Sequence, residues 1–195
     1  MADADTIRAV ESWVPSAAAG DRDALTEILR LVHPLMVRYC AARLANADIP
    51  HTPEDVAQEI CMAMIRSLPR YRDQGKSFLA FVYGIAAHKV ADARRGGDVL
   101  WLRTSGEMPE KVCPEASPED RVLAFERRGY VRDLMEVLSP THREVLVLRI
   151  VMGWSAAQTA EALGTSAGVV RVMQHRALNR LRNEMRTRTP ELIAV

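Results

Sequence analysis

The stretch that decides the fold is Leu138–Glu184, which reads LSPTHREVLVLRIVMGWSAAQTAEALGTSAGVVRVMQHRALNRLRNE. Within it, Ser139 is suited to cap a helix over residues 140–152 that Gly153 ends. Ser155, with Gln158 three residues on, then precedes a short apolar segment that Gly164 closes, and Ser166 precedes a longer segment. A serine before a helix accepts a hydrogen bond from a free backbone N–H, and a glycine after a helix adopts the left-handed backbone that ends it. The stretch therefore predicts a short helix, a turn and a long helix, which is the arrangement of a helix-turn-helix.

The long helix of this unit has an apolar face and a basic face. Its apolar face, which should be buried, holds Val169, Val170, Met173, Ala177 and Leu181. The opposite face carries Arg171, His175, Arg176, Arg180 and Arg182. Residues 167–188 contain six arginines and one acid, so ion pairs along the helix do not explain the pattern. An arginine face of a single sign suits phosphates and guanine edges, which favours contact with DNA over an ordinary solvated face.

The composition limits what the rest of the chain can be. The net charge is only +1 over 195 residues, so the basic charge is local and the whole molecule is no general binder of nucleic acid. The three cysteines form no C-x-x-C pair, which argues against a zinc site or a disulfide framework. Cys40 and Cys61 lie in apolar helical contexts, whereas Cys113 lies in a polar stretch as a candidate exposed thiol. Without a signal peptide or a membrane-spanning run, we expect a cytoplasmic protein with no membrane insertion.

The N-terminal half predicts four helices, at residues 6–19, 21–44, 52–68 and 77–95. Pro34 should kink the second helix, Thr52 should cap the third, with Pro53 at its first position, and Gly96-Gly97 should end the fourth. The segment 69–77, PRYRDQGKS, should be a loop. No segment alternates apolar and polar residues as a strand does, so a sheet is not expected.

An all-α fold of two small helical domains follows, with boundaries at residues 5–96 and 118–189. Between them, residues 97–117 should form an extended linker, and residues 98–120 carry six acids against two bases. Ser117 and Pro118 are suited to begin a further helix that reaches about Val137.

Several motifs, in order, resemble the extracytoplasmic-function (group IV) sigma factors of bacterial RNA polymerase, within the sigma-70 family. They are AAAGDRDALTEIL at 17–29, PEDVAQE at 53–59, FLAFVYGIA at 78–86, DARR at 92–95, and the whole of 138–182. Within the family, residues 78–93 and 169–178 look most similar to an actinobacterial group. Four positions depart from the family pattern: Phe81 stands where tryptophan is common, His88 where asparagine is common, Cys61 where an aromatic residue is frequent, and Met173 where many relatives have arginine. We therefore interpret Phe81 and Met173 first as core residues, and His88 as a candidate for recognising a specific base.

The resemblance implies three sets of functional residues. Reading of the −35 element falls to Ser166, Arg171, Val172, His175, Arg176 and Arg180. Capture of a flipped base of the −10 element, and contact with the duplex beside it, fall to Arg70, Tyr71, Arg72, Gln74, Lys76, Tyr83, Ala87, His88, Lys89, Arg94 and Arg95. Contact with the coiled coil of the polymerase's largest subunit falls to Asp55, Gln58 and Glu59. From the residues alone, the loop could equally be a polar connector, and the acidic helix face could simply be solvated.

The same resemblance implies the partners. These are core RNA polymerase through its beta and beta-prime subunits, promoter DNA and an anti-sigma protein, with no cofactor, no metal and no catalytic residue. The acidic linker resembles the segment that threads the polymerase's RNA channel, although a plain tether explains the same composition. A two-domain regulator whose N-terminal half binds a signal or dimerises is the alternative. An enzyme is not indicated, since the five histidines are scattered and no P-loop or ligand cluster occurs.

Overall fold

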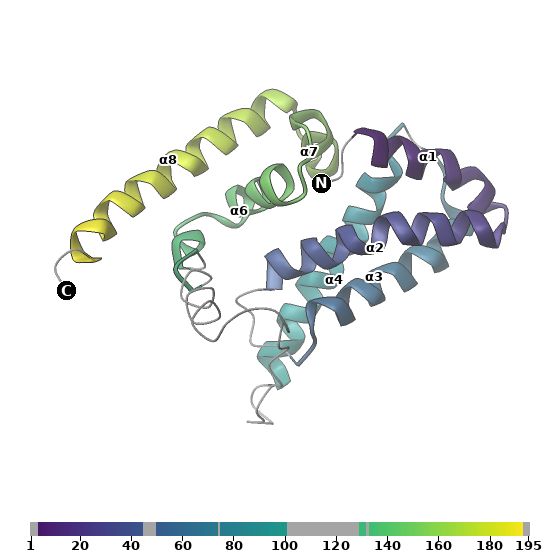
Figure 1. The fold of residues 1–195 in the computed structure, drawn as a ribbon, viewed down its shortest axis with the longest axis horizontal. Coiled ribbons are helices and arrows are strands. Elements are labelled where there is room, and N and C mark those ends of the chain that lie inside the picture. The colour runs from purple at the N-terminus through teal and green to yellow at the C-terminus, as the bar shows by residue number, and fades with distance from the viewer. Residues whose placement is uncertain (1–3, 45–49, 74, 101–128, 132, 193–195) are drawn as a thin grey trace, which may run out of the picture.

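The computed structural model describes residues 4–44, 50–73, 75–100, 129–131 and 133–192, and every regular element among them is helical (Figure 1). The predicted all-α class is therefore confirmed for this part of the chain. Gln74, Cys113, most of the linker predicted at 97–117 and the start of the helix predicted after Ser117 lie outside the described residues. Of that last helix, residues 129–131 and 133–136 are described and are helical.

Four helices pack together in the N-terminal half: α1 (Ala4–Ala18), α2 (Arg22–Leu44), α3 (Pro53–Ser67) and α4 (Phe78–Leu100). Gly20 has a φ of 100°, a backbone conformation that favours glycine, and it turns the chain from α1 into α2. The Asp21 carboxylate then accepts the N–H of Asp23 at 2.9 Å and so caps α2. At the start of α3, the side chains of Thr52 and Asp55 each accept the other's backbone N–H, at 3.1 and 2.9 Å. This is the capping box that fixes where α3 begins.

Two predicted boundaries in this half are wrong. The helix α4 continues through Gly96 and Gly97 to Leu100. A glycine costs a helix about 1 kcal/mol relative to alanine, which weakens the helix there and does not forbid it. The loop predicted to begin at Pro69 begins later, because Leu68–Arg70 form one 3₁₀ turn, η1. Proline fits the start of such a turn, where its missing N–H leaves no bond unmade.

The C-terminal half contains α6 (Pro140–Leu146), a π-helical turn η2 (Val147–Val151), α7 (Ala156–Leu163) and α8 (Ala167–Leu192). The predicted caps are present: Ser139 begins α6, and Ser155 with Gln158 forms a capping box on α7. Gly164 ends α7 with a φ of 64°. The helix-turn-helix prediction is therefore confirmed, except that the helix expected to run evenly to Met152 widens into a π turn in its second half.

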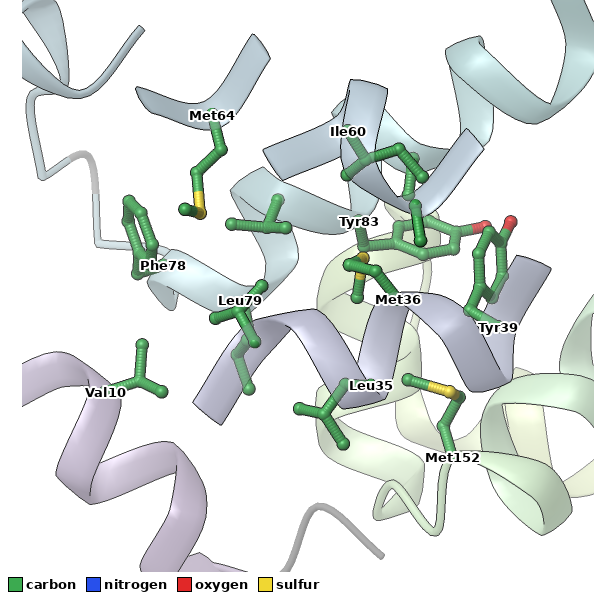
Figure 2. Close-up of a cluster of buried hydrophobic side chains, with 14 of the residues drawn as sticks. Val10, Leu35, Met36, Tyr39, Ile60, Met64, Phe78, Leu79, Tyr83 and Met152 are labelled. Atoms are coloured by element: carbon green, nitrogen blue, oxygen red, sulfur yellow. The ribbon is translucent and has the colours of Figure 1, made fainter. Parts of the chain in front are cut away.

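The two halves share one hydrophobic core. Val147, Leu148, Met152 and Trp154 are each at most 2% exposed and belong to the same cluster as the buried residues of α1 to α4. Figure 2 shows Met152, from the C-terminal half, in one cluster with Leu35 and Tyr39 of α2. The ring of Tyr83 lies 5.7 Å from that of Tyr39 and 5.9 Å from that of Trp154, both edge to face. Aromatic contact therefore continues from α2 through α4 into the segment before α7.

Replacing Thr52 with alanine should lower the free energy of unfolding by about 1 kcal/mol, since the N-terminus of α3 would lose its side-chain acceptor. Thr26→Ala is the matched control, because it removes the same hydroxyl from the exposed interior of α2, where alanine is the better helix former. Urea denaturation of the two variants measures the difference. Equal losses of stability would contradict the role of the capping box.

Candidate nucleic-acid interface

The long helix α8 presents the predicted basic face to solvent. The Ser166 hydroxyl oxygen accepts the N–H of Val169 at 3.3 Å and caps the helix. Val170 and Ala177 are fully buried beneath it. The exposed face carries Arg171, Val172, His175, Arg176 and Arg180. The structure thus places all six residues expected to read the −35 element at the capped start or on the open face of one helix.

One predicted core residue of α8 is exposed. Val169 is 41% exposed, whereas Met173 packs half-buried against the small cluster around Val145 and Val170. The reason is that among the described elements α8 packs mainly on α6 and α7, so its buried stripe is narrow and centred on Val170 and Ala177. Val169 lies one residue, about 100°, to the side of that stripe.

Arg149, which is not among the predicted functional residues, connects the parts of the helix-turn-helix. Its Nε donates to Oε1 of Gln174 on α8 at 2.9 Å, and its Nη1 donates to the carbonyl of Trp154 before α7. One side chain in η2 therefore fixes the recognition helix relative to the turn. An arginine inside the apolar run VLVLRIV was the available signal, because a charge in such a run needs partners.

The loop between η1 and α4 lies over an aromatic cluster. The ring of Tyr71 lies 5.1 Å from the rings of both Phe78 and Phe81, and its hydroxyl donates to the Lys76 carbonyl at 3.3 Å. Burial raises the pKa of Tyr71, with nearby Glu11 as the next cause, so the phenol stays neutral. Phe81, which we interpreted first as a core residue, is half-buried and packs against the hydrophobic core in addition to Tyr71.

A groove of about 650 Å³ opens beside this loop. Its lining is Arg66, Ser67, Arg70, Tyr71, Arg72, Lys76, Ala80, Phe81, Gly84, Glu161 and Ala162. Four of the predicted loop residues, Arg70, Tyr71, Arg72 and Lys76, therefore share one concave and mostly cationic surface. Glu161 and Ala162 come from α7, so the C-terminal half closes one side of the groove.

The predicted DNA-contacting residues of α4 do not form one surface. His88 and Arg95 are exposed, Ala87 and Arg94 are half-buried, and the Lys89 amine lies 3.0 Å from Glu59 of α3. Tyr83 is different, since it is only 6% exposed and its hydroxyl donates to the Glu144 carboxylate at 2.9 Å. In this conformation Tyr83 is a core residue, and a contact with DNA would require it to be uncovered.

The acidic face of α3 is open, as predicted. Asp55, Gln58 and Glu59 are all exposed along one side of the helix. Asp55 has a second role that was not predicted, because its carboxylate completes the capping box with Thr52. Any test of its function must therefore keep that acceptor.

Two carboxylates of the C-terminal half bind the N-terminal half, and neither was predicted to do so. Glu144 accepts hydrogen bonds from the hydroxyls of Tyr39 and Tyr83, both at 2.9 Å, and lies 2.9 Å from Nε of Arg43. Burial, followed by the charge of Glu144, raises the pKa of both tyrosines. Glu161 accepts the backbone N–H of Ser77 and, at 3.2 Å, its hydroxyl.

The described residues offer no sign of a metal centre or of a membrane span. No three His, Cys, Asp or Glu side chains among them group as a metal site would. No described helix is both long and apolar enough to cross a bilayer. Cys40 and Cys61 are buried free thiols whose pKa values burial raises to about 12 and about 11, which disfavours their reactive thiolate form.

Comparisons with known families match both halves. Sigma-70 region 2 matches residues 28–98, and Sigma-70, region 4 matches residues 134–183. The second match contains the helix-turn-helix, and the first contains α3, the aromatic loop and nearly all of α4.

Whole-chain relatives agree with the two matched regions. The ECF RNA polymerase sigma factor SigD of Mycobacterium tuberculosis (strain ATCC 25618 / H37Rv) is 46% identical over 177 residues, which cover 90% of this chain and 84% of that protein. The ECF RNA polymerase sigma factor ShbA of Streptomyces griseus is 42% identical over 187 residues, covering 91% and 96%. The structure of CnrH in complex with the cytosolic domain of CnrY has a TM-score of 0.67, covers 92% of this chain and 98% of that one, and at 22% identity indicates the fold alone.

Proposed function

Because this chain belongs to the extracytoplasmic-function RNA polymerase sigma factors, it is a promoter-specific transcription initiation factor, and we propose how its residues divide that work. Residues 5–96 bind core polymerase and open the −10 element, residues 118–189 read the −35 element, and residues 97–117 link them. The protein selects and binds DNA, while the polymerase supplies the catalysis. The observation that carries this proposal is the exposed arginine face of α8, on a helix capped by Ser166.

Reading of the −35 element is assigned to the open face of α8. Arg171 and Arg176 can each donate two hydrogen bonds to a guanine edge, and His175 and Val172 between them can contact neighbouring bases. Ser166 and Arg180, at the cap and further along, suit the phosphates on either side. Arg149 acts through Gln174 and holds this face at a fixed angle to the turn.

Arg171→Ala and Arg176→Ala should each weaken holoenzyme binding to a −35-containing promoter by about 1–3 kcal/mol, while binding to random duplex changes less. Arg186→Ala is the matched control, because Arg186 is an exposed arginine of the same helix beyond the expected footprint. Competition binding against specific and random DNA separates the two effects. If specific and random DNA lose affinity equally, the residues contact phosphate and do not read bases.

Opening of the −10 element is assigned to the loop 69–77 and to α4. A factor that melts DNA without ATP must bind the unpaired strand more tightly than the duplex, since equal affinity shifts no equilibrium. The groove beside the loop suits this task, because Arg70, Arg72, Lys76 and the sequence-predicted Gln74 can hold backbone and base edge around the Tyr71 aromatic surface. His88, Lys89, Arg94 and Arg95, with Ala87, extend the contact to the adjoining duplex, and Tyr83 joins them only when its ring is uncovered.

Tyr71→Ala combined with Arg72→Ala should spare the closed promoter complex and impair opening, because capture of the flipped base offsets an unpairing cost of about a few kcal/mol. Permanganate reactivity of the −10 thymines and run-off transcription measure the loss. A pre-melted bubble template is the control, since it removes the unpairing step and should restore activity. If the variant opens duplex promoters like the parent protein, the loop is a connector and this assignment fails.

Polymerase binding is assigned to the open face of α3, with Asp55, Gln58 and Glu59 as the contacts. An acidic and amide face of this kind suits a basic helical partner surface. Glu59 also pairs with Lys89, so the polymerase-binding face and the DNA-binding face meet at one ion pair.

Asp55→Asn with Gln58→Ala should weaken binding to core polymerase by about tenfold or more, through loss of a charge and a hydrogen bond. Asparagine keeps an acceptor for the Thr52 N–H, so the cap of α3 survives the change. Competition with the parent protein for core enzyme gives the affinity, and thermal unfolding checks the cap. Unchanged affinity would remove this face from the interface.

Two further assignments follow from the family. The protein acts in the cytoplasm, where bacterial core polymerase and promoter DNA are found. An anti-sigma protein is the expected regulator, and the structural relative CnrH was likewise solved with a bound protein, the cytosolic domain of CnrY. Pull-down of an anti-sigma protein by the full chain, with or without added core polymerase, tests whether the two partners compete.

A further inference from the structure

Two valines are exposed on the first two turns of α8, a helix whose open face is otherwise polar. Val169 is 41% exposed and Val172 is 48% exposed, and the two lie one helical turn apart. From residue 173 to residue 184, every exposed side chain of the helix is polar. Valine is also a weaker helix former than alanine, leucine or lysine, so the pair does not strengthen the helix. A pair of valines on the face that carries Arg171 and Arg176 therefore indicates an apolar contact with whatever that face binds.

Gly168 lies on the same open face, and nothing among the described residues requires a glycine there. Its backbone is helical and its φ is not positive, so backbone conformation is not the reason. A Cβ added at this position would meet only the Ser166 hydroxyl oxygen, at 3.9 Å, so close packing within the protein is not the reason either. Glycine weakens a helix relative to alanine, because it loses more backbone freedom on folding. Its remaining use is to let another molecule approach the helix backbone closely.

The glycine and the two valines belong to one surface. Residues three and four positions apart are neighbours on a helix, so Gly168 adjoins both Arg171 and Val172. Val172 in turn adjoins Val169 and Arg176. A valine side chain is much shorter than an arginine side chain, so a partner that touches both kinds must come close to the helix backbone. Gly168 leaves that space open.

The chemistry that matches this surface is a thymine methyl group. The N-terminal residues of a recognition helix contact base edges in the major groove. Adenine, guanine and cytosine present hydrogen-bond donors and acceptors there, whereas thymine also presents its C5 methyl group. A valine side chain makes only apolar contacts, so among the four bases thymine alone offers it a matching group.

We propose that Gly168, Val169 and Val172 form a methyl-reading surface that selects thymine in the −35 element. The surface contacts one or two thymine methyl groups beside the base pairs that Arg171 and Arg176 contact. The inference rests on the proposed −35 role of α8. It adds the class of base that the apolar part of the helix selects, and it adds Gly168 and Val169 to the residues that determine specificity.

The test uses the full chain in reconstituted holoenzyme, with a promoter that this holoenzyme selects from a pool randomised at the −35 element. The selected sequences should contain thymine at one or two positions of the element, on either strand. Replacing such a thymine with deoxyuridine removes the methyl group and leaves every hydrogen-bonding group of the base in place. The parent holoenzyme should then bind about three- to fivefold less tightly, because burial of one methyl group contributes about that factor.

Val169→Ala and Val172→Ala supply the protein side of the same test. Each variant should bind the thymine promoter less tightly than the parent protein does. Each should also lose less affinity than the parent when deoxyuridine replaces thymine, since the contact with the methyl group is already gone. Val131→Ala is the matched control, because Val131 is a helical valine of the same half, is 56% exposed and lies outside α8.

Gly168→Ala separates DNA binding from stability. The added methyl group should raise the midpoint of thermal unfolding by about 1–4 °C, because alanine reduces the freedom of the unfolded chain. Gly129→Ala is the matched control and should do the same, since both are helical glycines at which an added Cβ has no close contact. Gly168→Ala should nevertheless weaken promoter binding by about tenfold, because its Cβ holds the helix away from the base edges. Gly129→Ala should leave promoter binding unchanged.

Three results would overturn the proposal. The first is selected promoters without thymine in the −35 element, and the second is valine variants that lose as much affinity as the parent when deoxyuridine replaces thymine. The third is unchanged promoter binding by Gly168→Ala, which would remove the close approach. Arg171→Ala, measured on the same promoters, shows which claim has failed. If it alone loses specific binding, the −35 role of α8 stands and only the methyl-reading surface is lost; if no variant of α8 loses binding, the −35 role itself is wrong.

Discussion

The whole structure depends on one buried carboxylate. Glu144 is satisfied only when Tyr39, Tyr83 and Arg43 are all in reach, and those three side chains come from two helices of the other half. Glu144 thus ties α6 to both α2 and α4, and beside it η2 packs in the shared core and α7 packs against α4. Apolar packing supplies most of the attraction between the halves, but it tolerates sliding, whereas a charge with three partners does not.

Local features of the fold could be predicted from the sequence, because their causes are local. Thr52, Ser139, Ser155, Ser166 and Gly164 each act within four residues of themselves, and each ends or begins a helix where expected. The partners of Glu144 are 105 and 61 residues away along the chain, so nothing in THREVLVL reveals them. The π turn was missed although its cause is local. It arises from a backbone bond, the N–H of Met152 to the carbonyl of Val147 at 2.9 Å, that shifts the helical phase without any residue signal.

The functional surfaces also divide into those that the sequence could predict and those that depend on distant contacts. The exposure of Arg171, His175 and Arg176 followed from helical spacing, because a single helix decides which side they occupy. Tyr83 could not be placed, since one face of α4 meets the core and the ring of Trp154 covers it. Asp55 shows a third situation, in which the sequence indicated only a binding face, and the structure adds a capping role that its carboxylate fills while remaining exposed.

The start of α4 is held from two directions, and the two contacts come from different halves of the chain. Glu161 reaches it from the C-terminal half, whereas Glu11 of α1 accepts the N–H of Phe78 at 2.5 Å from within the N-terminal half. Burial raises the pKa of Glu11, so this contact forms at some energetic cost. Because one carboxylate comes from each half, the start of α4 has an acceptor within its own half as well as one from the other half. The first helix, which precedes the matched region beginning at residue 28, thereby stabilises the N-terminus of a helix that lies inside that region.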